Sequence, residues 1–430
     1  IMLENYENII IYGLGQSGIS SYEKLKDRKN IFIWDDCEKK RKELEKKGYE
    51  FIEPRKWPWE KIDLLISSPG IALNFGTNSF IVKESIKNKI KIVGDIEVFY
   101  QELKSLGIRK KIIAVTGTNG KSTFVSVLNE ILQKSGLKSC IAGNIGIPVL
   151  SLNADESDII ILELSSFQLE LIDEFRADIS VLLNVFEDHN ERYGSYEEYQ
   201  KTKTKIFLNQ RKSDHAIFDD FYLSEKVLKE INPSPKHVLF KDNEFNDLSN
   251  KISQNEIIKK FLPALIKVTD ILDVDRNFVI NQLKKFKNLN HRIYEVCSKN
   301  GVSFINDSKA TNPAAANFAA SQFKDIYWIL GGLSKNNDLT KLNLSNKNIK
   351  KIFLIGSSSD QLSQIIPKKV KFEVSHNLEN ATRSAYKEVL KSQKGCILLS
   401  PGCSSQDQFI DYQERGNKFT KIVNNLVVKC

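Results

Sequence analysis

The sequence predicts an α/β protein built from three domains. Short apolar runs alternate with amphipathic helical patterns along nearly the whole chain, which is typical of parallel sheets covered by helices. At 430 residues the chain is too long for a single hydrophobic core. Two glycine-rich turns, at Gly13 and Gly117, each follow an apolar run and precede a helical pattern. They predict two separate sites for phosphate groups.

The composition narrows the class of protein. Hydrophobic residues make up 41% and charged residues 27% of the chain, and no run of eighteen apolar residues predicts a membrane span. The N-terminus lacks a basic region followed by an apolar stretch, so we expect no secretory signal and a cytoplasmic location. The six cysteines are scattered without metal-ligand spacing, which predicts reduced thiols. Although the net charge is +9, no basic stripe with interleaved aromatics indicates nucleic-acid binding.

The first predicted domain covers residues 1–99. Its glycine turn reads Gly13-x-Gly15-x-x-Gly18, and Asp35 follows twenty residues after Gly15. This is the spacing of the dinucleotide fingerprint, in which the acid contacts a ribose, and on its own it favours NAD. The predicted strands of this domain are 9–12, 31–34, 62–67 and 90–93.

Two further domains are expected at 100–290 and 291–430. A polar, basic stretch at 101–111 reads as a linker before the second domain, and residues 209–260 are too weakly patterned for any element to be assigned. The second boundary is placed near residues 286–296. The predicted strands of these domains are 112–117, 159–165, 179–185, 302–307, 326–332, 351–356 and 396–402.

The stretch AVTGTNGKST (114–123) is the most informative one in the sequence. A strand, a loop of small residues and a helix in this order predict backbone amides that meet the phosphates of a nucleotide. Lys121 would reach the β- and γ-phosphates, and the hydroxyl of Ser122 or Thr123 could bind Mg²⁺. Val115 stands where the common pattern has its first glycine. An NAD enzyme does not need this second nucleotide site.

The loop GTNGKST, with Val115 before it, resembles the Mur ligases of peptidoglycan synthesis. Further stretches in the family's order narrow the resemblance to the members that add D-glutamate: SSPGIAL (67–73), GNIGIP (143–148), LELSSFQLE (162–170), NVFEDHNERY (184–193), NDSKATNP (306–313) and LSPGCSSQDQFIDYQERGNKF (399–419). The resemblance covers all three predicted domains and is weak at 209–285. It implies a Rossmann-like N-terminal domain, a central ATPase-like P-loop domain and a Rossmann-like C-terminal domain.

The implied reaction is the ATP-dependent ligation of D-glutamate to UDP-N-acetylmuramoyl-L-alanine through an acyl phosphate, by a monomer acting on small molecules. The first glycine turn would then hold the uridine diphosphate of the substrate rather than NAD. The resemblance places the nucleotide-sugar contacts at Ser17, Asp35, Asp36, Gly70, Asn144, Ser165 and His189.

The resemblance also implies which cations and side chains neutralise the negative charges of the bound substrates. Triphosphate and carboxylate repel each other, so cations must lie between them, and two Mg²⁺ sites are expected. Lys121 would be catalytic together with Glu163, His189 and Lys203, the last three also being metal ligands with Ser122. Lys203, four residues after Tyr199, would be carbamylated, because an ammonium group cannot bind a metal. ATP contacts are expected at Gly117, Thr118, Asn119, Gly120, Lys121, Ser122, Thr123, Arg292, Asp307 and Lys309.

The C-terminal domain would bind the two carboxylates of D-glutamate and close over the nucleotide. Its implied contacts are Thr311, Lys335, Ser405 and Tyr412, where the family more often has phenylalanine at the last position. A His-Asn pair that the family uses for nucleotide binding has no counterpart in 255–268. Three alternatives remain from the residues: an amide ligase for another amino acid, a non-catalytic nucleotide-binding protein, and an NAD oxidoreductase.

Overall fold

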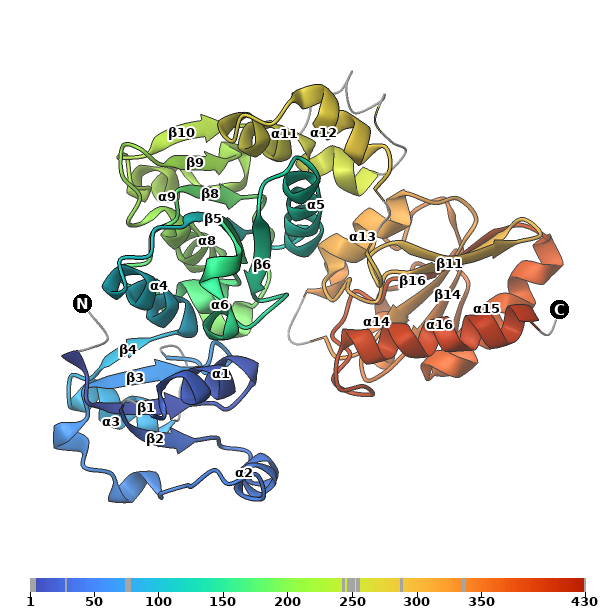
Figure 1. Cartoon of the computed structure of the whole chain (residues 1–430). Helices are drawn as coiled ribbons and strands as arrows, with labels where there is room; N and C mark the ends of the chain where they lie inside the picture. The colour runs from blue at the N-terminus through green and yellow to red at the C-terminus, as the bar shows by residue number, and fades with distance from the viewer. Residues whose placement is uncertain are drawn as a thin grey trace. The chain divides into compact units, whose positions relative to one another are not determined.

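A computed structural model describes residues 5–27, 29–73, 79–241, 244–245, 252, 256–286, 289–334 and 338–428. The chain forms two compact units, one of residues 1–185 and 192–285 and the other of 186–191 and 286–430. The first unit contains two parallel sheets and the second contains one mixed sheet, all flanked by helices (Figure 1). The α/β fold predicted from the alternation of apolar runs and helical patterns is confirmed. No helix in the described ranges is long and apolar enough to cross a membrane.

The first sheet has four parallel strands in the order β2-β1-β3-β4. Ile9 and Ile11 belong to the same apolar cluster as Leu25 of α1, whereas Ile10 packs on the opposite face with Val82 of α3. Alternate residues of the central strand therefore serve two helical layers, as a buried parallel strand requires. The elements are β1 (Asn8–Tyr12), α1 (Gln16–Leu25), β2 (Asn30–Trp34), α2 (Glu38–Glu45), β3 (Leu64–Ser67), α3 (Phe80–Lys87), β4 (Lys91–Val93) and α4 (Asp95–Ser105).

The second sheet has six parallel strands in the order β10-β9-β8-β5-β7-β6. Its central strands β5 and β7 pair so that Val115 lies opposite Glu163, which brings the carboxyl ends of the two strands together. The elements are β5 (Lys111–Thr116), α5 (Lys121–Lys134), β6 (Ser139–Gly143), β7 (Ile159–Glu163), α6 (Ser166–Leu169), β8 (Ile179–Leu182), α7 (Asn190–Tyr193), α8 (Tyr196–Thr204), β9 (His215–Phe218), α9 (Glu225–Glu230), β10 (Lys236–Leu239), α11 (Glu256–Ile271) and α12 (Arg276–Leu283).

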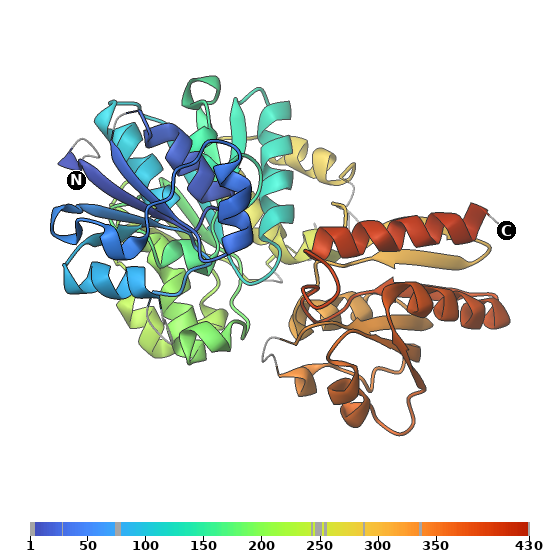
Figure 2. The same ribbon diagram turned by 90° about the horizontal axis from the view of Figure 1, so that it is seen from below.

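The third sheet has the order β11-β12-β16-β13-β14-β15, and only β11 runs antiparallel to its neighbour among its described pairings. Helices α15 and α16 lie side by side on one face (Figures 1 and 2), and α13 and α14 pack on the other. The elements are β11 (Tyr294–Lys299), β12 (Val302–Asn306), α13 (Pro313–Ser321), β13 (Ile326–Gly331), β14 (Ile349–Ile355), α14 (Ser359–Ile365), β15 (Phe372–His376), α15 (Leu378–Ser392), β16 (Gly395–Leu399) and α16 (Tyr412–Val428).

The predicted linker at 101–111 is wrong for its first half. Helix α4 continues to Ser105, because Phe99 and Leu103 are buried in the apolar cluster that the first two sheets have in common. The weakly patterned region 209–260 also contains the strands β9 and β10, which the sequence did not reveal.

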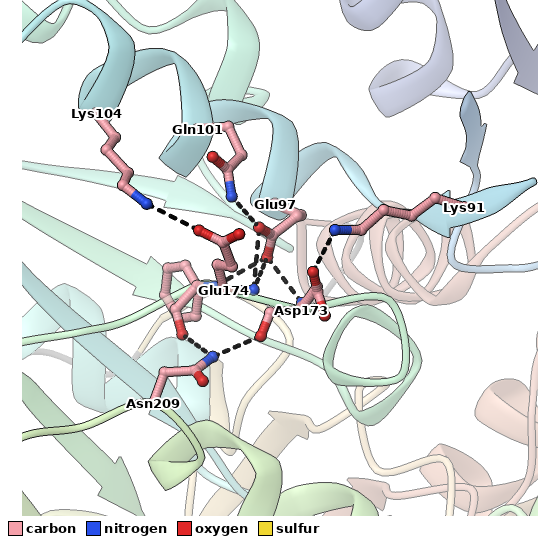
Figure 3. Close-up of polar contacts among 8 residues, drawn as sticks. Lys91, Glu97, Gln101, Lys104, Asp173, Glu174 and Asn209 are labelled. Carbon is pink, nitrogen blue, oxygen red and sulfur yellow. Dashed lines mark hydrogen bonds and ion pairs between the residues drawn. The ribbon is translucent and has the colours of Figure 1, made fainter. Parts of the chain in front are cut away.

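A buried carboxylate on α4 joins this helix to the segment that follows α6. The side chain of Glu97 is 2% exposed, and it accepts hydrogen bonds from the backbone amides of Asp173, Glu174 and Phe175 at 2.8–3.1 Å (Figure 3). The amide of Gln101 donates to the same carboxylate at 2.7 Å. Because a buried carboxylate is costly unless it is hydrogen-bonded, this arrangement fixes the segment onto the helix.

We therefore predict that Glu97→Ala lowers the free energy of unfolding by about 3 kcal/mol, since the three backbone amides lose their shared charged acceptor. Equilibrium urea unfolding of the full chain measures this change. Lys104→Ala is the control, because Lys104 pairs with Glu174 at 2.8 Å on the surface of the same junction. Its expected effect is below about 1 kcal/mol. Equal effects of the two substitutions would contradict the prediction.

Candidate active site

The phosphate loop between β5 and α5 is held in place by Asn184, which follows β8. The side-chain oxygen of Asn184 accepts from the amides of Thr118 and Asn119 at 3.1 and 3.0 Å, and its amide group donates to the carbonyl of Asn119 at 3.0 Å. These two loop amides are thus engaged within the protein. A phosphate at this loop would rely on the amides from Gly120 onward, at the N-terminus of the 14-residue helix α5.

Two lysines converge on one carbonyl oxygen of this loop. The ammonium of Lys121 donates to the carbonyl of Gly117 at 2.7 Å, and that of Lys203 on α8 donates to the same oxygen at 3.0 Å. Lys203 is 1% exposed and its ammonium lies 4.7 Å from the centre of the Tyr199 ring, one helical turn earlier. The structure therefore brings together two of the four residues predicted to be catalytic.

Glu163 ends β7 beside this loop and is 1% exposed. One carboxylate oxygen accepts from the side-chain amide of Asn144 at 2.8 Å. The other, Oε2, is buried without a hydrogen-bond partner in the described part of the chain. A buried oxygen that lacks a donor is unfavourable, and a cation would satisfy it.

The predicted hydroxyl ligands lie at the start of α5. Ser122 and Thr123 are 5% and 2% exposed. Gly120, which precedes the helix, has φ +87°, a left-handed conformation that glycine adopts without strain. Within the described residues, no three His, Cys, Asp or Glu side chains cluster in a way that could hold a metal ion.

The first glycine turn is packed against the turn that follows β3. A Cβ added at Gly13, whose φ is +86°, would lie 2.5 Å from Cβ of Ser68 and 3.0 Å from Cδ1 of Ile71. A Cβ at Gly18 would lie 2.0 Å from the carbonyl oxygen of Gly13. Glycine is therefore required at both positions for close packing, and Gly70 lies in the turn that packs on Gly13.

The acids after β2 have partners within this domain. Asp35 accepts from the amides of Leu14 and Cys37 at 2.8 and 3.0 Å, so it ties the glycine turn to the loop after β2. Asp36 accepts from the hydroxyl of Tyr12 at 2.5 Å. Ser17 hydrogen-bonds the buried carboxyl of Asp95, whose pKa is raised mainly by burial. Ser17, Asp35 and Asp36, three of the predicted nucleotide-sugar contacts, thus follow the carboxyl ends of strands of the first sheet.

Ser165 caps the N-terminus of α6 and forms a capping box with Gln168. Its hydroxyl donates to Oε1 of Gln168 at 3.1 Å and accepts from the Gln168 amide at 3.2 Å. Asn144, opposite it across the strand ends, donates its backbone amide to the carbonyl of Glu163 at 2.9 Å. Asn144 and Ser165, two of the predicted nucleotide-sugar contacts, therefore adjoin Glu163 through hydrogen bonds or in the chain.

In the second unit, the segments after β12 and β16 lie together because these two strands are parallel neighbours. Asp307 is 7% exposed, and it accepts from the hydroxyl of Ser400 at 2.7 Å and from the amide of Ile293 at 3.1 Å. Burial raises the pKa of Asp307 to about 7, although these hydrogen bonds and the nearby charge of Arg292 oppose the shift. Arg292 and Asp307, both expected to contact ATP, thus interact electrostatically within this unit.

The buried guanidinium of Arg415 joins the same two segments. It donates to the hydroxyl and carbonyl of Ser308 at 3.0 and 2.8 Å and to the carbonyl of Cys403 at 3.1–3.2 Å. Burial lowers its pKa to about 10. The amide of Gly402 donates to the carbonyl of Ala310 at 2.9 Å. This network places Thr311 and the buried Ser405 on adjoining loops.

Lys309 lies over the ring of Tyr412, with its ammonium 4.0 Å from the ring centre. The backbone carbonyl of Tyr412 accepts from the hydroxyl of Ser308 at 2.8 Å, which fixes the start of α16 beside the loop. The ring of Tyr412 therefore contacts one of the residues predicted to meet ATP. Lys335 lies outside the described residues.

His189 belongs to the second unit and its side chain is 33% exposed. Its backbone amide donates to Asp188 at 2.9 Å, and Asp188 accepts from Asn312 at 3.3 Å, which places this segment beside the loop after β12. In the stretch 255–268, where the sequence lacks the expected His-Asn pair, α11 begins at Glu256, and 253–255 are outside the described residues.

Several residues that shape the site were not singled out from the sequence. Asn184 lies inside the quoted stretch NVFEDHNERY, but nothing local indicates that it bonds a loop 65 residues away. The same is true of Arg415. Arg192 lies in the same stretch as Asn184, and nothing in the neighbouring residues indicates which groups it contacts.

Comparison with known proteins gives one consistent family. Residues 115–271 match the family model described as the Mur ligase middle domain. A UDP-N-acetylmuramoylalanine–D-glutamate ligase from Wolbachia pipientis wMel is 32% identical, with 98% of this chain and 97% of the relative covered. The enzyme of the same description from Rickettsia bellii (strain RML369-C) is 34% identical, with 98% of each chain covered.

Solved structures show the same fold at lower identity. A MurF ligase from Thermotoga maritima, solved with ADP, has a TM-score of 0.59 at 16% identity and covers 85% of this chain and 90% of its own. The UDP-N-acetylmuramate-alanine ligase MurC of Thermotoga maritima has a TM-score of 0.55 at 16% identity and covers 98% of this chain and 100% of its own. With full-length relatives above 30% identity and a phosphate loop facing a buried carboxylate, the chain belongs to the Mur ligase family, among its UDP-N-acetylmuramoylalanine–D-glutamate ligases.

Proposed function

We propose that this protein joins D-glutamate to UDP-N-acetylmuramoyl-L-alanine at the expense of ATP, in the cytoplasmic synthesis of peptidoglycan precursors. The carboxylate of the alanyl group attacks the γ-phosphorus of ATP, ADP leaves, and an acyl phosphate forms. The amine of D-glutamate, after losing a proton, then attacks the acyl carbon, and inorganic phosphate leaves as the amide bond forms. Activation is needed because joining a carboxylate to an amine is unfavourable in water.

The observation that carries the proposal is the phosphate loop of Gly117 to Thr123 beside the buried Glu163. Val115 and Glu163 are paired in adjacent parallel strands, so the loop and the carboxylate lie at the same edge of the sheet. Ligands of open α/β sheets bind at this edge. The ammonium of Lys121, already at the loop, supplies positive charge where the β- and γ-phosphates would lie.

The residues present fit a magnesium ion. Glu163 offers a buried oxygen without a hydrogen-bond partner among the described residues, and Ser122 offers a hydroxyl at the start of α5. Lys203 and His189 complete the proposed ligand set. Bound Mg²⁺ would neutralise charge on the triphosphate, while the protein groups hold the nucleotide and the acceptor carboxylate in line.

Carbamylation of Lys203 is supported by its surroundings. Its ammonium is buried and shares the Gly117 carbonyl with the ammonium of Lys121, which also donates to the carbonyl of Thr118 at 3.1 Å, so two positive charges lie close together at the loop. Reaction of the neutral amine with CO₂ would form an N–C bond and release a proton. The resulting carbamate replaces a positive charge by a negative one, which removes this repulsion and provides an oxygen ligand for a cation.

The other two substrates are assigned to the remaining clusters. The glycine turn at Gly13, with Ser17, Asp35, Asp36 and Gly70, would hold the uridine diphosphate, and Asn144, Ser165 and His189 the muramoyl part. Thr311, Ser405, Tyr412 and Lys335 would bind D-glutamate, whose two carboxylates require hydroxyl donors and a fixed cation. Arg292, Asp307 and Lys309 would meet ATP.

The direct test is phosphate release by the purified full chain with ATP, Mg²⁺, UDP-N-acetylmuramoyl-L-alanine and a panel of amino acids. We expect release with D-glutamate at least about 100-fold faster than with L-glutamate, and none without the nucleotide-sugar. Release with a different amino acid would favour another amide ligase. A change in NADH absorbance, or no turnover with any amino acid, would contradict the proposal.

Lys121→Ala is expected to lower kcat by at least about 1,000-fold, because the loop loses the cation that faces the transferred phosphoryl group. Circular dichroism should show an unchanged fold. Lys134→Ala is the matched control, since Lys134 lies at the other end of the same helix and pairs with Glu130 on the surface. Retained turnover in the Lys121 variant would rule out this role for the lysine.

The carbamate is best sought by a method that does not use acid. Protein equilibrated with ¹³C-bicarbonate should give a carbamate signal in ¹³C NMR that disappears in Lys203→Met. Lys201→Met is the control, because Lys201 is on the same helix but pairs with Glu197 and Glu230 at the surface. A carbamate signal that survives in Lys203→Met would assign it elsewhere, and no signal in the unaltered protein would exclude the modification.

A further inference from the structure

A single guanidinium in the first unit connects the two sheets close to the proposed nucleotide-sugar site. Arg192, in the last turn of α7, donates from Nε and Nη2 to the two carboxylate oxygens of Glu170 at 2.8 and 2.7 Å. Its plane lies over the ring of Phe167, with the guanidinium carbon 4.0 Å from the ring centre. The side chains of Arg192 and Glu170 are 8% and 12% exposed, so the pair is largely shielded from water.

The same guanidinium makes a third contact, with the first sheet. Nη2 of Arg192 donates to the backbone carbonyl of Ile71 at 3.0 Å. Ile71 closes the turn after β3, since its amide donates to the carbonyl of Ser68 at 3.0 Å. This is the turn that packs on Gly13 so closely that no Cβ fits there. Arg192 therefore holds the element that supports the first glycine turn.

The other partners of Arg192, Glu170 and Phe167, lie next to the residues proposed to bind the muramoyl group. Glu170 directly follows α6, and Phe167 lies within that helix. Ser165, two residues after Glu163, caps the N-terminus of this helix. One side chain thus links the turn of the first sheet to the helix that follows the candidate metal ligand of the second.

We propose that Arg192 is a positioning residue for the nucleotide-sugar substrate, because it fixes the spacing between the turn beneath the uridine diphosphate and the helix beside the muramoyl group. This inference rests on the proposed function. Arginine is required because three contacts in one plane, two to a carboxylate and one to a carbonyl, together with stacking on a ring, suit a planar guanidinium and cannot all be made by an ammonium.

The test is Arg192→Lys, with binding measured by calorimetry separately from turnover. We expect the Kd for UDP-N-acetylmuramoyl-L-alanine to rise about tenfold, while the Kd for ADP changes less than about twofold, since the phosphate loop is held by Asn184 instead. In kinetics the KM for the nucleotide-sugar should rise in the same proportion, with the KM for ATP unchanged. If the unaltered protein binds the nucleotide-sugar without turnover, the proposed function fails while the binding comparison still tests Arg192.

Arg176→Lys is the matched control for a purely structural effect. Arg176 forms the same two-point contact with Asp214, at 2.7 and 2.6 Å, and also donates to the hydroxyl of Ser213 at 3.3 Å, so these hydrogen bonds stay within the second sheet's domain. It should lower the melting temperature without changing either Kd. Equal changes in nucleotide-sugar Kd for the two variants, or a change below twofold for Arg192→Lys, would overturn the proposal.

Glu170→Gln provides a second variant should Arg192→Lys fail to fold. This substitution removes the negative charge that pairs with Arg192 but keeps a side chain of the same shape. The Kd for the nucleotide-sugar should therefore rise about threefold to tenfold. In the double variant the effects should be less than additive, because both substitutions act through the same guanidinium. Full additivity would show that Glu170 and Arg192 act separately and would contradict the inference.

Discussion

The arrangement of the first unit depends on one constraint: the carboxyl ends of β5, β7 and β8 must meet at a single edge. The phosphate loop leaves β5, Glu163 ends β7, and Asn184 follows β8, so all three lie at one edge only because the strands are parallel neighbours in register. Asn184 then fixes the loop through two backbone amides and one carbonyl. In this loop conformation, Lys121 and Lys203 both donate to the Gly117 carbonyl.

In the second unit, a buried arginine side chain rather than strand register holds the candidate loops together. Its two candidate loops follow β12 and β16, and a buried guanidinium, Arg415, binds the backbone of both. A charged group buried in this way is costly unless its donors are satisfied, and here they meet carbonyl and hydroxyl oxygens. The loops that carry Lys309 and Ser405 are therefore held in one relative position within this unit.

The fold and the centre of the site could be predicted from sequence to different degrees. Strands such as β5, β7 and β13 are continuous apolar runs, so their positions were predicted within a few residues. Strands β10 and β15 were missed because they lie at sheet edges and carry exposed polar residues. The phosphate loop was evident from local order, whereas Glu97, Asn184 and Arg192 act on backbone atoms far away in the chain, which no local pattern encodes.

The cap at the start of α6 restricts what can bind beside it. A serine hydroxyl can donate one hydrogen bond and can accept two through its lone pairs. The hydroxyl of Ser165 donates to the side-chain oxygen of Gln168 and accepts from the backbone amide of Gln168, so one lone pair is left to accept a further hydrogen bond. A ligand that hydrogen-bonds to this oxygen must therefore supply the donor, such as the N–H of an amide or the O–H of a sugar. An ionised carboxylate has no donor, so its contact with this oxygen would be unfavourable.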